Sequence, residues 1–161
     1  MAKKPAPKKV PLRLEYRRPS ELAANPANWR RHPAAQLTAL ADVIAEVGWA
    51  GVLLYNERTE RLIDGHARKE IAARTDESVP VVIGSWTETQ ERTILATLDP
   101  LAAMAEADSA ALDALLKGVT TDSAAIQAML DGLARDAGPA SGSTPPRPLP
   151  GRREPNSARC G

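Results

Sequence analysis

The chain has 161 residues, enough for one domain of ordinary size, and 43% of them are hydrophobic. With 21 Lys and Arg against 20 Asp and Glu, the overall charge neither shows nor excludes nucleic-acid binding. The single Cys160 excludes an internal disulfide and a cysteine-based metal site, and the lack of a long apolar run or signal-peptide pattern predicts a cytoplasmic protein without a membrane segment.

The charge is nevertheless distributed unevenly along the chain. Residues 1–31 carry nine basic and two acidic groups, residues 32–136 carry eight and seventeen, and residues 137–161 carry four and one. Both ends lack apolar periodicity, so we expect a disordered basic arm over 1–9 and a disordered Pro/Gly/Arg tail over 137–161. Such arms either contact phosphate backbones loosely or serve as solubilising tails.

The first predicted elements are a strand, a turn, a loop and a helix. Apolar and polar residues alternate over Val10–Tyr16, which predicts a half-buried strand, and Ser20 is expected to cap a short turn through Leu22. A polar loop follows over Asn25–Pro33, with Pro33 suited to the first turn of a helix. That helix has one apolar face and stops at Gly48; the face consists of Leu37, Leu40, Ala41, Ile44 and Val47.

The rest of the chain continues to mix strands and helices. Strands are predicted at 52–55 and 61–63 around a turn at 56–59, and a buried strand at 79–83. Helices are predicted at 65–74, at 87–98 behind a capping pair of Thr87 and Gln90, and, after Pro100, at 109–116 and 123–134. This order predicts an α+β fold.

One segment combines residues that favour chemistry. In Leu62-Ile63-Asp64-Gly65-His66-Ala67-Arg68-Lys69-Glu70 a strand passes through a glycine into a helix, with polar and cationic residues at the junction. The first N–H groups of a helix have no internal partner and attract anions, so a phosphate fits here. Arg68 would add a bidentate clamp and His66 a single donor, while Asp64 would orient His66 or hold a Mg²⁺. In the alternative, Gly65 is a simple turn and the side chains are solvated.

Four blocks of this sequence occur in the order seen in a known family. They are the loop Asn25–Pro33, the helix that ends at Gly48, the strand pair leading to Asp64-Gly65-His66-Ala67-Arg68, and Val79-Pro80-Val81-Val82. Together they resemble the ParB-like N-terminal domain of the ParB/sulfiredoxin superfamily, over about residues 10–104. The resemblance implies a small mixed sheet with flanking helices, followed here by a helical extension over 105–136 that adds two C-terminal helices.

The resemblance also implies a ligand and its contacts. The Gly-x-x-Arg turn of the family takes nucleotide phosphates, so the expected contacts are Gly65, His66, Ala67 and Arg68, with the Arg30-Arg31 loop close to the turn. The expected cofactor is a nucleoside di- or triphosphate, with or without Mg²⁺. Asp64 is then the candidate catalytic and metal residue, and Asp99 a second candidate for the metal.

Within the superfamily, two activities fit this chain poorly. Sulfiredoxins place a nucleophilic cysteine directly after the glycine, where this chain has His66, so their chemistry is excluded. Partition proteins that hydrolyse CTP carry further arginines in the turn and an acidic-amide pair with an arginine on the next helix. Here Ala67, Lys69 and Glu70 interrupt the first pattern, and Leu98-Asp99-Pro100-Leu101-Ala102 stands near the second without its cation. CTP-driven clamping is not expected.

Two enzymatic alternatives use the same turn. The free serine kinase that takes phosphate from ADP is similar in its own Asp-Gly-His-x-Arg turn, and it would need a carboxylate base, for which Glu15 and Glu21 are the candidates here. A ParB-like nuclease would need two or more metal-binding carboxylates around the turn, of which only Asp64 is well placed.

DNA contact is expected through charge and not through sequence reading. The last helix has no Lys or Arg between Lys117 and Arg135, so it is a poor recognition helix, and its apolar face is expected to pack on the domain or on a second subunit as a homodimer. Non-specific contacts would come from Arg30, Arg31 and the basic arms, while Trp29 would either stack on a base or anchor the loop.

The sequence therefore predicts a ParB-like nucleotide-binding module, of bacterial, phage or mobile-element origin, that acts in DNA transactions. The alternatives are an enzyme of the same fold, either a metal-dependent nuclease or an ADP/ATP-dependent small-molecule kinase, and a partner-binding protein with a degenerate site.

Overall fold

The fold is built around a four-stranded mixed sheet. The computed structural model describes residues 10–138, so the predicted basic arm, most of the predicted tail and Cys160 lie outside the described residues. The strands are β1 (Arg13–Arg17), β2 (Leu53–Asn56), β3 (Arg61–Asp64) and β4 (Val79–Gly84), in the order β1-β4-β2-β3. β2 runs parallel to β4, whereas the β1–β4 and β2–β3 pairs are antiparallel. The predicted α+β class is confirmed.

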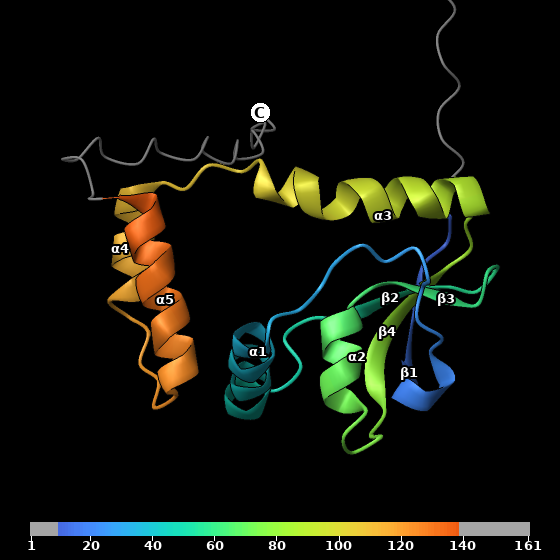
Figure 1. The fold of residues 1–161 in the computed structure, drawn as a ribbon, viewed down its shortest axis with the longest axis horizontal. Helices are drawn as coiled ribbons and strands as arrows, with labels where there is room; N and C mark the ends of the chain where they lie inside the picture. Colours follow the sequence, from blue (N-terminus) through green and yellow to red (C-terminus); the bar gives the residue numbers. More distant parts are fainter. Residues whose placement is uncertain (1–9, 139–161) are drawn as a thin grey trace, which may run out of the picture.

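Five helices and a short 3₁₀ turn complete the described chain. They are η1 (Pro19–Glu21), α1 (Ala34–Val47), α2 (His66–Ala72), α3 (Glu88–Ala103), α4 (Ser109–Leu116) and α5 (Ala124–Ala137). In Figure 1, α3 extends across the molecule above α1 and α2, and α4 and α5 stand side by side near its C-terminal end. Between residues 10 and 138 no helix has both the length and the apolar composition needed to cross a bilayer.

The core is small and almost entirely aliphatic, because the chain has no Phe and few other aromatics. Its buried residues come from β2, β3, β4 and α2 and from Leu22, which directly follows η1; the half-buried Trp49 packs against them. They are Leu22, Leu53, Tyr55, Leu62, Ala72, Val79, Val81 and Ile83. β4 lies between β1 and β2, which explains why its sequence is apolar at nearly every position, as predicted.

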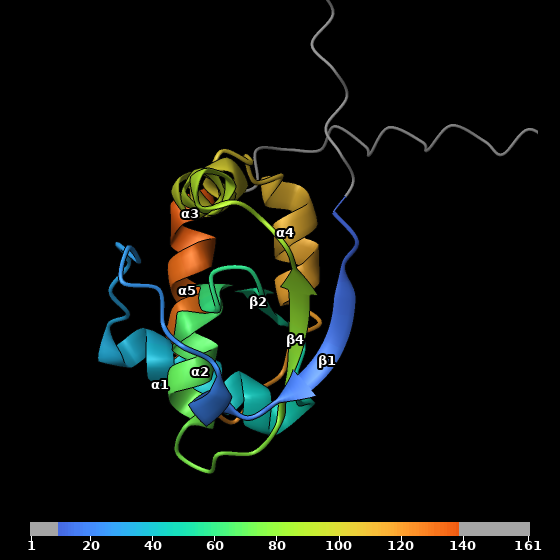
Figure 2. The same cartoon turned by 90° about the vertical axis from the view of Figure 1, so that its right-hand side faces the viewer.

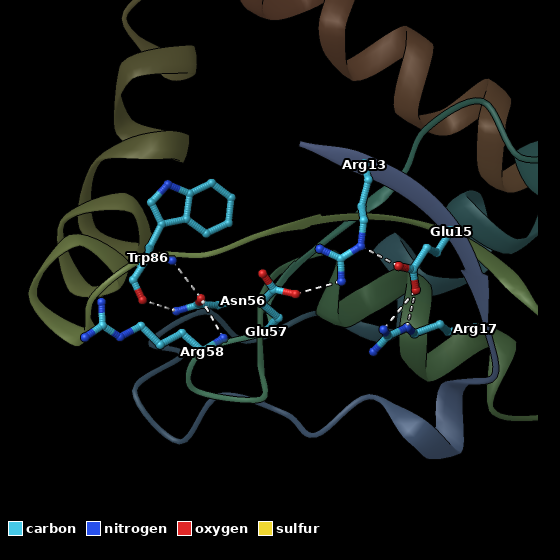
Figure 3. Close-up of polar contacts among 7 residues, drawn as sticks. All are labelled: Arg13, Glu15, Arg17, Asn56, Glu57, Arg58 and Trp86. Atoms are coloured by element: carbon cyan, nitrogen blue, oxygen red, sulfur yellow. Dashed lines mark hydrogen bonds and ion pairs between the residues drawn. The ribbon is translucent and has the colours of Figure 1, made fainter. Parts of the chain in front are cut away.

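The first strand forms, but its apolar side chains face outward. Leu14 and Tyr16 are 58% and 69% exposed, so the prediction of a strand whose apolar residues form its buried side was wrong. The register explains the reversal, because Arg13, Glu15 and Arg17 lie opposite the buried Ile83, Val81 and Val79 and therefore share the core side of the sheet. These charges form ion pairs with one another and with Glu57 (Figure 3), at the outer edge that β1 occupies in Figure 2.

Three smaller predictions also need correction. Ser20 does not cap the first turn, because Glu21 accepts from the N–H of Arg18 and Ser20 instead bonds Asp76. Val47 at the end of α1 is exposed. The third predicted helix does not stop before Pro100 but continues to Ala103, and Asp99, in the turn before the proline, is held by an ion pair to Arg30. The predicted Thr87–Gln90 cap and the stop at Gly48 are confirmed.

The two C-terminal helices pack on the rest of the chain through α1. Ile126 of α5 is buried, and the hydroxyls of Ser123 and Thr121 bond the carboxylates of Asp42 and Glu46 on α1. α5 extends to Ala137, one residue into the predicted tail. This packing matters for function because it brings α5 to one wall of a cavity.

Candidate functional site

A cavity of about 650 Å³ lies where five segments meet. Its walls come from the 28–32 loop, α1, the turn between β3 and α2, α3 and α5. The polar lining is Asn28, Arg30, His32, Gln36, Asp64, Gly65, His66 and Arg68, with Asp99 from the C-terminal half of α3; the apolar lining includes Leu40, Val43, Ile63, Ile94, Leu98 and Met129. Of the residues that the sequence suggested for a site, the structure gathers Arg30, Asp64, Gly65, His66, Ala67, Arg68 and Asp99 around one space.

The turn at Gly65 is shaped by a backbone that favours glycine. Gly65 has φ 89° and ψ 22°, in the left-handed region, and an added Cβ would lie 2.8 Å from Cγ of the fully buried Leu53. α2 starts directly after it, so the N–H groups of His66, Ala67 and Arg68 have no acceptor within the helix. Because α2 has only seven residues, its dipole is weak, and an anion here depends mainly on side-chain cations.

Arg68 supplies such a cation. Its guanidinium is half-buried and occupies the space beside Gly51, where an added Cβ would lie 2.9 Å from Nη2. Among residues 10–138 no hydrogen bond or ion pair engages this guanidinium. Arg68 therefore lines the cavity with its donors available to a ligand.

His66 is held as a neutral ring. The backbone N–H of Asn25 donates to Nε2 at 3.3 Å, so Nε2 carries the lone pair and Nδ1 the proton. Burial, the largest effect, lowers the pKa of His66 below its ordinary value, although Asp64 opposes it. At neutral pH His66 thus offers one N–H donor and no charge.

The loop of residues 25–30 lies along α3. Trp29 donates from Nε1 to the carbonyl of Leu95 at 3.1 Å, so the anchoring role weighed for this side chain is present, while 60% of Trp29 remains exposed. Nε of Arg30 lies 2.6 Å from Oδ2 of Asp99, and its guanidinium also covers the Trp29 ring at 5.4 Å. A phosphate that uses Arg30 must therefore compete with Asp99.

Arg31 is the one predicted contact that does not line the main cavity. It lines a neighbouring, more open pocket together with Trp29, Arg30, His32 and Gln36, all of which also line the main cavity. Arg30 therefore faces both pockets, whereas Arg31 faces the outer one alone.

Of the four acidic residues that the sequence suggested for a site, two line the cavity and two do not. Asp64 and Asp99 both line the cavity, but the described residues contain no group of three or more His, Cys, Asp or Glu placed to hold a metal. Glu15 pairs with Arg13 and Arg17 on β1, and Glu21 caps η1, so neither candidate kinase base lies in the lining.

Sequence reasoning missed a buried polar network next to the cavity. The carboxylate of Glu91, 2% exposed, accepts from Nδ2 of Asn25 at 2.8 Å, from Nδ2 of Asn56 at 2.6 Å and from the Thr59 hydroxyl. Burial opposes ionisation, but the bonds from Thr59, Asn56 and Asn25, with the charge of Arg61, outweigh it and hold the pKa of Glu91 below its ordinary value. Glu91 is therefore a buried carboxylate.

A signal for this network was present in the sequence. Glu91, Ile94, Leu95 and Leu98 have the spacing of one helix face, so Glu91 interrupts an otherwise apolar stripe. An acidic residue on such a stripe indicates buried partners. Its partners could not be found in the same way, because Asn56 was placed in a surface turn, whereas it ends β2 and bonds the backbone of Trp86 (Figure 3).

Comparison with known proteins identifies the fold. No protein-family model matches the chain, and no curated protein matches it in sequence. Among solved structures, the chain is similar to the C-terminally truncated chromosome-partitioning protein ParB from Caulobacter crescentus complexed with CTP-gamma-S, with 19% identity and a TM-score of 0.52, over 65% of this chain and 59% of that one. A Pnob8-like ParB-N domain is similar over 55% of this chain and 35% of its own, with 17% identity and a TM-score of 0.44.

These similarities have a defined extent. The chain spans little more than half of the Caulobacter structure and about a third of the Pnob8-like one. The similarity to the Caulobacter structure shows that the chain has a ParB-like fold, which confirms the resemblance at the level of the fold.

Proposed function

We propose, on the basis of the fold that this chain shares with ParB N-terminal domains, that it is a nucleotide-binding module and that the cavity beside Gly65 holds the phosphates. The observation that carries the proposal is the Arg68 guanidinium, which lines the cavity with no partner among the described residues. The N–H groups at the start of α2 add donors at the turn, and His66, which also lines the cavity, has its Nδ1–H left to donate. The similar Caulobacter protein was crystallised with a nucleotide analogue, CTP-gamma-S.

The composition of the cavity favours a ligand with one charged and one apolar part. Donors are concentrated at the turn and the 28–32 loop, whereas Leu40, Val43 and Met129 form an apolar wall on α1 and α5. A nucleoside di- or triphosphate combines a polyanion with a flat base and fits a volume of about 650 Å³. Mg²⁺ would be shared between the phosphates and Asp64, with Asp99 as a second ligand once it leaves Arg30.

Calorimetric titration tests this proposal directly. The full chain is titrated with CTP, ATP and ADP, each with and without Mg²⁺, and Arg68→Ala is compared with Arg74→Ala, an exposed arginine that does not line the cavity. Loss of a charged bidentate contact should weaken binding by about 10- to 100-fold in Arg68→Ala and leave Arg74→Ala unchanged. If wild-type protein binds none of the three nucleotides at millimolar concentration, the proposal is wrong and a partner-binding protein with a degenerate site is favoured.

A second variant tests whether nucleotide binding depends on the position of the Arg68 guanidinium, without removing its charge. An added methyl at Gly51 would overlap the Arg68 guanidinium, whose flexible end can move away. Gly51→Ala should therefore leave the stability nearly unchanged while it weakens nucleotide binding. Equal weakening of both properties would indicate a folding defect instead.

We further propose that the module acts in DNA transactions, with Arg31 as a non-specific contact. Arg31 is exposed and does not line the main cavity, which leaves it accessible to a duplex when the nucleotide site is filled. Binding to duplex DNA should weaken steeply with salt, and Arg31→Ala should reduce the slope of log K against log salt by about one. A slope unchanged by the substitution would remove Arg31 from the interface.

Activity assays on the full chain test whether the site is enzymatic. Turnover of the bound nucleotide, phosphorylation of a small hydroxyl compound, or nicking of plasmid DNA would each identify an enzyme, and Asp64→Ala should abolish the activity if Asp64 holds the metal. Binding without turnover in all three assays would favour a binding module.

A further inference from the structure

The buried carboxylate of Glu91 lies outside the cavity lining, and nothing in the proposed phosphate site uses it. Removing a carboxylate from water costs free energy unless hydrogen bonds compensate for it. The two carboxylate oxygens of Glu91 accept three hydrogen bonds. The donors belong to three separate segments: the loop at Asn25, the end of β2 at Asn56 and the following turn at Thr59. Glu91 is thus a junction between parts of the chain that are far apart in sequence.

One arm of this junction leads to the candidate site. The side chain of Asn25 donates to Glu91, and the backbone N–H of the same residue donates to Nε2 of His66. The 4% exposed fraction of Asn25 leaves little room for water to replace either bond. The orientation of the His66 ring is therefore connected to Glu91 through a single residue.

The contact with Glu91 is the first of three that hold the loop on α3. Asn25, Trp29 and Arg30 contact Glu91, Leu95 and Asp99 in turn, and these α3 residues are spaced by four, so they share one helix face. Of the three α3 groups, only the Glu91 carboxylate is a buried charge. Leu95 offers an uncharged backbone carbonyl, and Asp99 is half-buried. Buried bonds of a charged group are the strongest of the three kinds.

We propose that Glu91 is a positioning residue of the candidate site. Through Asn25 it fixes the start of the 25–30 loop and keeps His66 in the tautomer that carries its proton on Nδ1. The effect on nucleotide affinity rests on the proposed function, whereas the effects on the ring and the loop exist in the protein without nucleotide.

The proposal requires an ionised carboxylate at this position. Glu91 faces two amide NH₂ groups and one hydroxyl, all of which can donate, and a carboxylate accepts from all of them. A glutamine of the same shape would turn its own NH₂ toward at least one of these donors. Glu91→Gln should therefore release either Asn25 or the Asn56–Thr59 pair while it keeps the volume of the side chain.

The test measures the ring and the loop by NMR on the full chain at about pH 8, where imidazole is neutral. The chain has two histidines, so the ¹⁵N ring signals of His66 are identified with a His32→Gln variant. Wild-type protein and Glu88→Gln, a control on the exposed side of the same helical turn, should show Nδ1 protonated, Nε2 unprotonated and a protected Asn25 amide. Glu91→Gln should show a mixture of tautomers and at least tenfold faster exchange of the Asn25 amide.

A second variant covers the case in which Glu91→Gln does not fold. Asn25→Ala removes the link to Glu91, together with the bond that Oδ1 of Asn25 accepts from the N–H of Ala27, and leaves Glu91 its bonds from Asn56 and Thr59. It should reproduce the mixture of tautomers. If a folded Glu91→Gln or Asn25→Ala keeps the wild-type tautomer and the wild-type exchange rate of the residue 25 amide, Glu91 does not position the site.

Titration with CTP and Mg²⁺ separates this inference from the proposed function. Both variants should weaken binding by about twofold to thirtyfold, and Arg68→Ala should weaken it without changing the His66 tautomer. If wild-type protein fails to bind CTP, ATP and ADP, the proposed function fails, while the NMR result still decides whether Glu91 holds the loop and the ring.

Discussion

Replacement of Gly65 by alanine should destabilise the fold more than any other glycine-to-alanine change at a positive φ in the described chain. Gly65 is buried between β3 and α2 with φ 89°, and an added Cβ would lie 2.8 Å from Cγ and 3.1 Å from Cα of Leu53. Real Cβ atoms essentially never approach another heavy atom within 3.0 Å. Because one of the two atoms belongs to the backbone of a central strand, a rotamer change of Leu53 cannot remove the overlap.

Two effects add at this position. A non-glycine residue in the left-handed region costs about 1–2 kcal/mol. Forcing an extra methyl into a packed core costs about 1–3 kcal/mol. The free energy of unfolding should therefore fall by about 2–5 kcal/mol, a large part of the 5–15 kcal/mol that stabilises a typical domain.

Two other glycines separate the strain from the overlap. Gly48 has φ 79° and ψ −163°, a backbone conformation that differs from that of Gly65 and is nearly restricted to glycine, and no atom lies within 4 Å of an added Cβ. Gly48→Ala should therefore show backbone strain without overlap, about 1–3 kcal/mol. Gly132 lies inside α5 with no positive φ, and its nearest contact would be Arg135 at 3.9 Å, so Gly132→Ala should stabilise the protein by about 0.5–1 kcal/mol. Urea unfolding followed by circular dichroism gives all three values.

The comparison is decisive because the chemical change is the same at each site. If Gly65→Ala unfolds at the same urea concentration as wild-type protein, the turn does not require glycine. The backbone at Gly65 would then not be shaped for a close approach to Leu53.

Three further predictions follow from other parts of the fold. The pKa of Glu91 in the folded protein lies below its ordinary value of 4.5, so the ionised carboxylate stabilises the fold above that pH, and this contribution is lost as the pH falls through the folded pKa. The difference in unfolding free energy between wild-type protein and Glu91→Gln, measured by urea unfolding, should therefore become smaller in acid. A difference that grows in acid would contradict the assignment of Glu91 as a buried carboxylate. Thr87→Ala removes the N-cap of α3 and should cost about 1 kcal/mol in the same assay, with no loss indicating that the cap is replaced by water. Asp99→Asn frees Arg30 and should leave Mg²⁺-independent nucleotide binding equal or tighter by calorimetry, whereas a loss confined to Mg²⁺-containing buffer would make Asp99 a metal ligand.

Much of the fold was predictable from local patterns. The Thr87–Gln90 cap, the stop of α1 at Gly48 and the continuous apolar run of β4 each depend on neighbouring residues, and all three are present. The turn at Gly65 was predictable for the same reason, because a glycine between a strand and a helix indicates a special backbone conformation. These features follow from the residue types and their spacing.

The outward face of β1 shows where such patterns fail. Alternation of apolar and polar residues indicates that a strand has two different faces, but it does not tell which face meets the core. Here the pairing with β4 places Arg13, Glu15 and Arg17 on the core side, where Arg17 also covers the Tyr55 ring at 5.4 Å. The choice depends on strand register and on which side the helices cover.

The candidate site likewise combines features that follow from local sequence with features that depend on long-range contacts. Residue types and spacing nominate Gly65, His66 and Arg68 as anion contacts, because a strand–glycine–helix junction with nearby cations is a short stretch of chain. The structure places all three at one cavity, and their role stays a prediction. The ion pair of Arg30 with Asp99 and the link from Glu91 through Asn25 to His66 both depend on segments far apart in the sequence meeting in space, and no local pattern encodes such contacts. Long-range contacts therefore decide which of the candidate groups remain available to a ligand and which are held by the protein.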